Sequence, residues 1–172
     1  MMPFTIESRE SKTPNPQISI AEFDVAYIVE NFGDMMYKLA TAQLNNMSDA
    51  YDVVQDVLLK IHVKNPVWNN PEHIKLWLVR AVINCCRDYN KKFANIKKVK
   101  LNEVYSTLEG SEDYELQEAL ANLSQKYRIT LYLHYYEGYK VREIAEILSL
   151  SESAIKKRLV KGREMIKKYL ES

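Results

Sequence analysis

Apolar residues recur at intervals of three and four along most of the 172-residue chain, and this spacing constrains its fold more than any other feature. Near the start of the pattern lie Phe23, Tyr27, Ile28, Met36 and Leu39. Such intervals place side chains on one face of an α-helix, whereas a strand needs strict alternation. Because only 4 glycines and 5 prolines are present to make turns, a turn-rich β fold is excluded and an all-α fold is expected.

The same periodicity, together with capping residues, predicts where the helices lie. Ser48 and Ser151 can cap helices because a serine hydroxyl accepts a hydrogen bond from a first-turn N–H, and Gly138 suits a helix C-terminus. Pro66 and Pro71 bracket a loop. The expected helices cover residues 21–44 with an interruption near Gly33, a segment starting at Ser48, and residues 74–92, 114–123, 125–137, 141–148 and 151–170.

Charge is segregated along the chain although the formal net charge is only +1. Residues 81–100 hold six Lys or Arg against Asp88 alone, and residues 151–172 hold seven against three acids, whereas residues 101–118 carry six acids and no base. The length suits two small helical domains, and the stretch from about Phe93 to Asp113 loses periodicity and turns acidic, which indicates a linker between them. We expect a disordered tail at 1–19, domains at 20–93 and 114–172, and the linker at 94–113.

Several functional classes are excluded by what the chain lacks. It has no apolar run long enough to span a membrane and no signal-peptide pattern, so a cytoplasmic protein without membrane insertion is expected. Cys85 and Cys86 are adjacent, which supplies neither a disulfide framework nor metal-ligand spacing. Without a catalytic His, Ser or glycine-loop motif, we expect no enzyme activity, cofactor, metal or small-molecule substrate.

Residues 139–168, YKVREIAEILSLSESAIKKRLVKGREMIKK, have the pattern of a helix-turn-helix. Small Ala145 allows two helices to cross closely, and the final helix has a basic face suited to phosphates and to base edges in the major groove. The alternative is an amphipathic helix whose lysines are merely solvated. The candidate upstream DNA-binding residues are Ser153, Lys156, Lys157, Arg158, Val160, Lys161 and Arg163.

The longer string LQEALANLSQKYRITLYLHYYEGYKVREIAEILSLSESAIKKRLVKGRE resembles region four of the sigma-70 family of transcription initiation factors. That resemblance implies binding of the minus-thirty-five promoter element by the helix-turn-helix. Two departures occur: Ser124 stands where proline is common, and Ser149 where glycine is usual in the turn. Serine caps a helix well, whereas at the second position it can strain the turn.

The first half resembles region two of the same family in two places. DAYDVVQDVLLKIH is similar to the helix that docks on the polymerase clamp, which assigns polymerase contact to Asp52, Gln55 and Asp56. A solvated acidic face is the alternative for this stretch taken alone.

KLWLVRAVINCCRDYNKK is similar to the segment that reads and melts the minus-ten element, where a flipped base needs amide groups, a flat surface and nearby cations. The alternative for Trp68 and for Trp77 is a place in the core. The resemblance implies minus-ten contacts by Trp68, Asn69, Asn70, Arg80, Asn84, Arg87, Lys91 and Lys92.

Only about twenty residues separate the two matches, which is typical of the compact extracytoplasmic-function (ECF) group of the family. The resemblance implies an ECF-type sigma factor that binds core RNA polymerase and promoter DNA and directs promoter recognition, melting and initiation. It also adds a cognate anti-sigma factor as a candidate partner. The competing hypotheses are a polymerase-independent helix-turn-helix regulator, which would leave the first-half match unexplained, and a protein-binding adaptor, against which the basic final helix argues.

Overall fold

The computed structural model describes residues 23–44, 46–93 and 114–172, which form helices and no strand. The expected all-α fold is confirmed for these residues, whereas the expected tail and acidic linker lie outside them. None of the described helices is long and apolar enough to cross a membrane. The helices are α2 (Val25–Leu44), α3 (Met47–Lys64), α4 (Pro71–Phe93), α5 (Tyr114–Asn122), α6 (Gln125–Leu131), the π-helix η3 (Tyr132–Tyr136), α7 (Val141–Leu148) and α8 (Glu152–Leu170).

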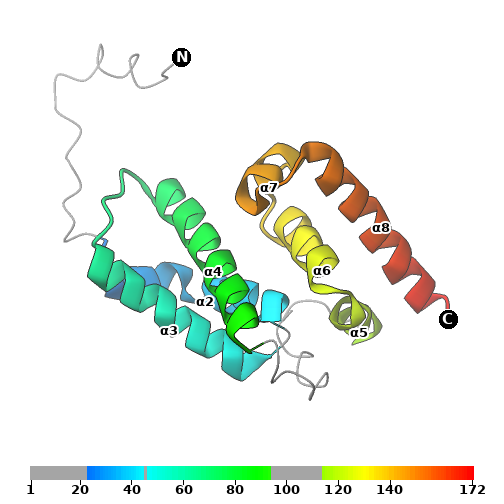
Figure 1. The fold of residues 1–172 in the computed structure, drawn as a ribbon, viewed down its shortest axis with the longest axis horizontal. Helices are drawn as coiled ribbons and strands as arrows, with labels where there is room; N and C mark the ends of the chain where they lie inside the picture. The colour runs from blue at the N-terminus through cyan, green and yellow to red at the C-terminus, as the bar shows by residue number, and fades with distance from the viewer. Residues whose placement is uncertain (1–22, 45, 94–113) are drawn as a thin grey trace, which may run out of the picture.

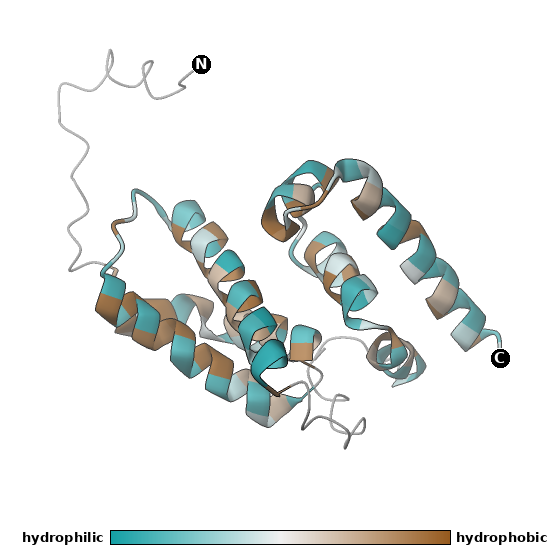
Figure 2. Ribbon diagram, in the orientation of Figure 1, coloured by the Kyte–Doolittle hydropathy of each residue, from teal (hydrophilic) through white to brown (hydrophobic). Residues whose placement is uncertain are grey.

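The helices form two groups that lie side by side (Figure 1). The first half, α2–α4, packs around fully buried side chains such as Met36, Val57 and Leu78. The second half, α5–α8, packs around Leu133, Ile144 and others. Figure 2 shows hydrophobic and hydrophilic residues alternating around the helices, as expected when each buries one face and exposes the other. Cys85 and Cys86 are both buried.

Helix starts in the first half differ in detail from the sequence-based expectation. The expected Ser48 cap is wrong: α3 starts at Met47, and the Asn46 side chain accepts a 2.9 Å hydrogen bond from the Asp49 N–H. Helix α2 runs through Gly33 without the expected interruption, since burial of its apolar face outweighs the weak helix propensity of one glycine. Helix α4 starts earlier than expected, at Pro71, where a missing N–H costs nothing.

The expected helix over residues 125–137 changes type part-way along. After Leu131 the backbone widens into the π-helix η3, in which Glu137 N–H donates to the Tyr132 carbonyl at 3.2 Å. Gly138, at φ +73°, then ends the helix as expected. Apolar periodicity does not distinguish a π-turn from an α-turn, because both place the same residues against the core.

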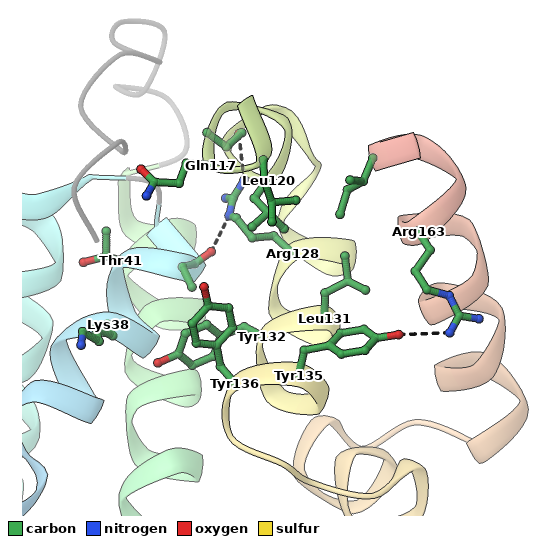
Figure 3. Close-up of a pocket in the computed structure, with 14 residues that line it drawn as sticks. Lys38, Thr41, Gln117, Leu120, Arg128, Leu131, Tyr132, Tyr135, Tyr136 and Arg163 are labelled. Atoms are coloured by element: carbon green, nitrogen blue, oxygen red, sulfur yellow. Dashed lines mark hydrogen bonds between the residues drawn. The ribbon is translucent and has the colours of Figure 1, made fainter. Parts of the chain in front are cut away.

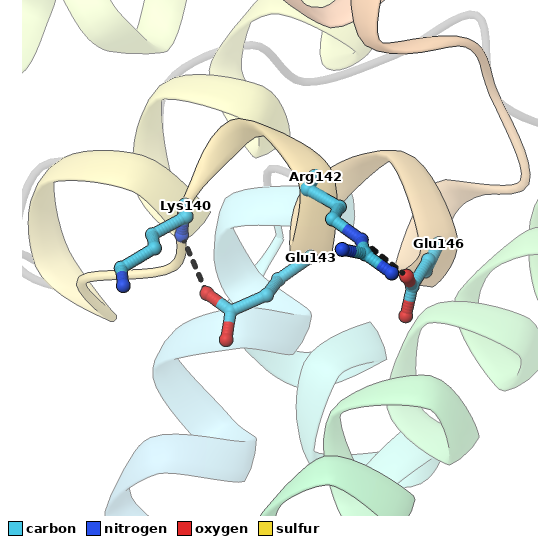
Figure 4. A network of polar contacts seen from close by, with 4 residues as sticks. All are labelled: Lys140, Arg142, Glu143 and Glu146. Carbon is cyan, nitrogen blue, oxygen red and sulfur yellow. Dashed lines mark hydrogen bonds and ion pairs between the residues drawn. The ribbon is translucent and has the colours of Figure 1, made fainter. Parts of the chain in front are cut away.

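The helix-turn-helix forms with the predicted bounds and caps. Ser151 accepts a 3.1 Å hydrogen bond from the Ala154 N–H at the start of α8. Polar contacts along α7 include the Lys140 backbone N–H donating to Glu143 at 2.7 Å, which satisfies a first-turn donor, and an Arg142–Glu146 ion pair (Figure 4).

Ser149 ends α7 in the left-handed region at φ 56° and ψ 49°. The turn carries the two hydrogen bonds of a Schellman motif, Leu150 N–H to Ala145 O at 2.9 Å and Ser149 N–H to Glu146 O at 3.4 Å. A residue with a Cβ in this region costs about 1–2 kcal/mol more than glycine. The strain expected where serine replaces the usual glycine therefore lies in the left-handed backbone of Ser149.

We predict that Ser149→Gly raises the free energy of unfolding by about 1 kcal/mol, because relief of strain at the left-handed position outweighs the greater backbone entropy that glycine brings to the unfolded chain. Chemical denaturation followed by circular dichroism measures this. Gly138→Ala, at another exposed left-handed position, serves as the opposite control and should destabilise. An unchanged or lower stability of Ser149→Gly would contradict the strain argument.

Candidate nucleic-acid interface

Helix α8 presents its basic residues to solvent because its apolar residues face inward. Ile155 and Leu159 are buried, so the positions between them on the helix point outward. Lys157 and Lys161 lie one turn apart, and both are exposed. The structure places Ser153, Lys156, Val160 and Arg163 on the exposed surface as well, whereas Arg158 is half-buried.

Two further residues belong beside this face, although sequence analysis did not select them. Lys126 and Tyr127, at the start of α6, line a shallow groove together with Lys156, Lys157, Arg158 and Lys161. Close packing of α6 on α8 creates this neighbourhood, since a Cβ on Gly162 would lie 3.0 Å from the Leu131 side chain. No local sequence pattern predicts that Lys126 lies beside α8, because Lys126 precedes the helix-turn-helix and has the spacing of an ordinary solvated lysine.

On α4, four of the predicted minus-ten residues form a single exposed stripe. Arg80, Asn84, Arg87 and Lys91 are separated by intervals of four, three and four, which keeps them on one side of the helix. All four are exposed. Lys92 is exposed too, but it lies about 100° around the helix from Lys91.

The loop before α4 is divided between packing and exposure. Trp68 is buried, with 9% of its surface exposed, and meets Trp77 edge-on at 5.8 Å between ring centroids. Asn70 is partly engaged, because its side chain accepts a 2.9 Å hydrogen bond from the His73 N–H, whereas Asn69 is exposed. The Trp68 indole N–H is buried without an acceptor among the described residues, so this ring belongs to the core in the arrangement observed.

Helix α3 exposes Asp52, Gln55 and Asp56, the predicted polymerase contacts. The pKa of Tyr89, on the neighbouring α4, is raised to about 12. Burial is the largest cause, followed by the hydrogen bond to Asp49 and the negative charges of the α3 aspartates. An exposed apolar stripe runs along the same helix at intervals of four and eight. It comprises Tyr51, Leu59 and Val63, exposed by 61%, 60% and 73%.

A buried arginine connects the two halves. Arg128, on α6, is only 7% exposed, and its Nε donates to the Ala42 carbonyl in the last turn of α2 at 2.5 Å (Figure 3). Its Nη1 donates to the carbonyls of Ala121 and Leu123 at the end of α5, at 3.1 and 2.6 Å. Burial lowers the pKa of the guanidinium to about 10. It stays charged at neutral pH, and the helix C-terminal carbonyls that it caps are partly negative.

Two polar contacts accompany Arg128 across the same boundary. The Gln125 amide donates to the Gln43 side-chain oxygen at 2.5 Å. The Lys75 ammonium lies 2.9 Å from the Glu137 carboxylate, which is 90% buried, given its 10% exposure. An apolar cavity of about 170 Å³ adjoins Arg128 between the halves, with tyrosines of η3 among its lining (Figure 3). The halves are therefore docked and not merely tethered.

Docking turns the α4 stripe toward the second half. Burial, together with the charges of Glu137 and Glu143, raises the pKa of Tyr139 to about 12. The positive charge of Arg80 acts in the opposite direction, so Arg80 lies near Tyr139 and the start of α7. Arg87 and Lys91 line one groove together with Arg158 of α8. The structure thus brings together residues predicted to serve two separate promoter elements.

Comparison with known proteins identifies the family. A protein-family model described as "Sigma-70, region 4" matches residues 113–166. The RNA polymerase sigma factor SigZ of Bacillus subtilis is 30% identical over 135 residues, which cover 75% of this chain and 77% of SigZ. The chain belongs to the sigma-70 family of RNA polymerase sigma factors.

Other similarities place this sigma factor in the ECF group. The ECF sigma factor SigW of B. subtilis is 26% identical over 164 residues, covering 84% of this chain and 88% of SigW. The sigma factor RpoE of Bartonella quintana, solved in complex with the anti-sigma factor NepR, matches with a TM-score of 0.66 at 19% identity, covering 85% of this chain and 96% of RpoE. The structural match supports the fold, whereas the sequence matches establish the family.

We predict that reversing one charge of the Lys75–Glu137 pair weakens docking of the sigma factor's halves. Lys75→Glu would set two carboxylates against each other, and a coupling of about 0.5–3 kcal/mol is typical of residues in contact. Small-angle scattering should show a larger radius of gyration for Lys75→Glu and recovery in the double variant Lys75→Glu, Glu137→Lys. Lys64→Glu, on an exposed helix end away from the boundary, is the control. An unchanged radius in the single variant would show that this pair does not hold the halves.

Proposed function

We propose that this chain is an ECF-type sigma factor that acts in the cytoplasm, binds core RNA polymerase and directs promoter recognition, melting and transcription initiation. The observation that carries the proposal is the pairing of two separate DNA-suited surfaces in one chain of the sigma-70 family. One is the exposed stripe on α4 and the other is the basic face of α8. The sigma-70 family is not a family of enzymes, and the proposed role needs no catalytic centre in this chain.

We assign the residue roles on the same basis, with residues 20–93 and 114–172 as the two functional domains. Asp52, Gln55 and Asp56, with the neighbouring apolar stripe of α3, supply the polymerase-binding face, because apolar area beside charge gives both affinity and orientation. The α4 stripe, with Lys92 and the Asn69–Asn70 loop, holds the minus-ten strand. The α8 face, with Lys126, holds the minus-thirty-five duplex. Trp68 supports the loop from the core.

We also propose regulation by an anti-sigma factor. The support is that a protein of the same fold, RpoE of B. quintana, was solved in complex with the anti-sigma factor NepR. An inhibitor that contacts both halves of this chain would cover the proposed DNA surfaces at once, since residues of both surfaces line one groove here.

The central test is transcription in vitro. We expect the protein to convert core RNA polymerase into a promoter-specific enzyme while binding promoter duplex weakly alone, because its net charge of +1 supplies little phosphate affinity. Replacing Asp52, Gln55 and Asp56 together by alanine should weaken polymerase association at least tenfold, or about 1.4 kcal/mol, without unfolding the protein. Co-purification and titration of transcription measure this.

A matched control replaces two exposed acids and one exposed amide on α2, Glu30, Asn31 and Asp34, by alanine. This triple variant removes the same charge from the same half and should leave polymerase binding unchanged. Equal losses in both triple variants would contradict a specific α3 docking face. Tight sequence-specific DNA binding without any stimulation of core polymerase would favour an autonomous regulator instead.

A separate prediction distinguishes base reading from phosphate holding on α8. Lys157→Ala or Lys161→Ala should cost about 1–3 kcal/mol on the preferred upstream element and relax its sequence preference, because these exposed lysines share one stripe. Arg158→Ala should weaken all promoters alike and reduce the salt dependence. Promoter-library transcription measures both. A change of sequence preference in Arg158→Ala alone would reverse the assignments.

A further inference from the structure

A groove of about 520 Å³ runs between the two halves, on the side where α4 faces α6 and α8. Its size lies within the range of about 300–1,000 Å³ that is usual for small-molecule sites. Three kinds of side chain line it, and each kind comes from both halves. They are the apolar Ile83, Ile129, Leu148 and Leu150, the amides Gln43, Asn90 and Gln125, and the cations Arg87, Lys91, Lys126 and Arg158.

The charges of the groove are unbalanced. Among the residues that the structure describes, no carboxylate lines it, and none of its four cations forms an ion pair with another of these residues. Arg87 and Lys91 come from the first half, and Lys126 and Arg158 from the second, so docking brings like charges toward each other. Like charges that share a site repel, and a bound polyanion would convert this repulsion into attraction between the halves.

The groove also has an uncharged lining, which a phosphate group alone would leave without a partner. Leu150 is the partly exposed apolar side chain of its lining, whereas Ile83 and Ile129 are only 1% and 3% exposed and form its floor. Gln43 is 6% exposed and already holds the Gln125 amide at 2.5 Å, so the amide pair is fixed in place. Apolar surface beside preset amide groups suits a nucleobase, which has flat faces and a polar edge, while flexible cations suit its phosphates.

We propose that this groove binds a nucleoside polyphosphate, with the base against the apolar and amide lining and the phosphates between Arg87 and Lys91 on one side and Lys126 and Arg158 on the other. The site is complete only while the halves are docked, so a bound nucleotide stabilises the docked form by mass action. Arg87, Lys91 and Arg158 are also proposed promoter contacts. Nucleotide and promoter DNA therefore compete for the same side chains.

The test uses the full chain alone, without polymerase or DNA, so that its result is independent of the proposed function. Calorimetric titration with GTP and ATP should show one site per chain. Inorganic tripolyphosphate should bind more weakly, because it lacks a base, and guanosine more weakly still, because it lacks the phosphates. Scattering should show that GTP reduces the radius of gyration.

Single-residue variants locate the site. Lys91→Ala and Lys126→Ala, one in each half, should each weaken GTP binding by about tenfold, since each removes one charge-assisted contact. Lys92→Ala is the matched control: it is the neighbour of Lys91 and is also exposed, but it lies outside the groove. Like Lys126, it lies near the ring of the aromatic residue that follows it, at 5.4 Å compared with 4.9 Å. It should bind GTP normally.

Three results would overturn the proposal. One is an equal loss in Lys92→Ala, which would indicate diffuse attraction to a basic surface. Another is undiminished GTP binding in the docking variant Lys75→Glu if scattering shows its halves apart, which would place any site within one half. The third is tighter binding of a single-stranded oligonucleotide than of GTP with the same pattern of variant effects, which would make the groove part of the DNA path.

Discussion

The capping of two helix ends by Arg128 is the interaction on which the arrangement of this sigma factor depends. Its guanidinium reaches carbonyls in the last turn of α2 in one half and at the end of α5 in the other. Both helix ends would otherwise leave buried carbonyls without donors, at a cost of about 1–3 kcal/mol each. One buried side chain thus completes the fold of the second half and fixes how the first half meets it.

Docking brings the two proposed DNA surfaces together at one groove. The minus-ten and minus-thirty-five elements lie about 25 base pairs apart, or roughly 85 Å along a duplex at 3.4 Å per step. In the docked form Arg87 and Arg158, which are proposed to serve different elements, line one groove. A chain that binds both elements at once must therefore separate its halves. The contacts that it gives up are the Arg128–Ala42 and Gln125–Gln43 hydrogen bonds and the Lys75–Glu137 ion pair.

The distribution of charge fits a protein that another molecule delivers to DNA. Exposed cations are concentrated on α4 and α8, so the near-neutral total conceals two basic surfaces. Linking weak contacts through a large partner multiplies their effect without new contacts. The exposed apolar side chains Tyr51, Leu59 and Val63 lie beside the exposed acids of α3 and strengthen the case for this helix as the docking face. Apolar residues grouped on one exposed face are typical of interaction sites, whereas singly scattered ones are not.

Local and periodic features were determined by the sequence alone: the helical class, the helix-turn-helix with its Ser151 cap, the strained Ser149 turn and the exposed stripes of α4 and α8. Each depends on residues a few positions apart, where helix geometry dictates which side chains share a face. Where local rules competed, as at Ser48 against Asn46 or at Gly33 within α2, packing chose the outcome. Only the tertiary structure decided that Trp68 lies in the core, that Lys126 joins the α8 face and that Arg128 binds Ala42, 86 residues away. Contacts at such separation leave no period in the sequence, because they depend on how whole helices pack and on which buried carbonyls then lack a donor.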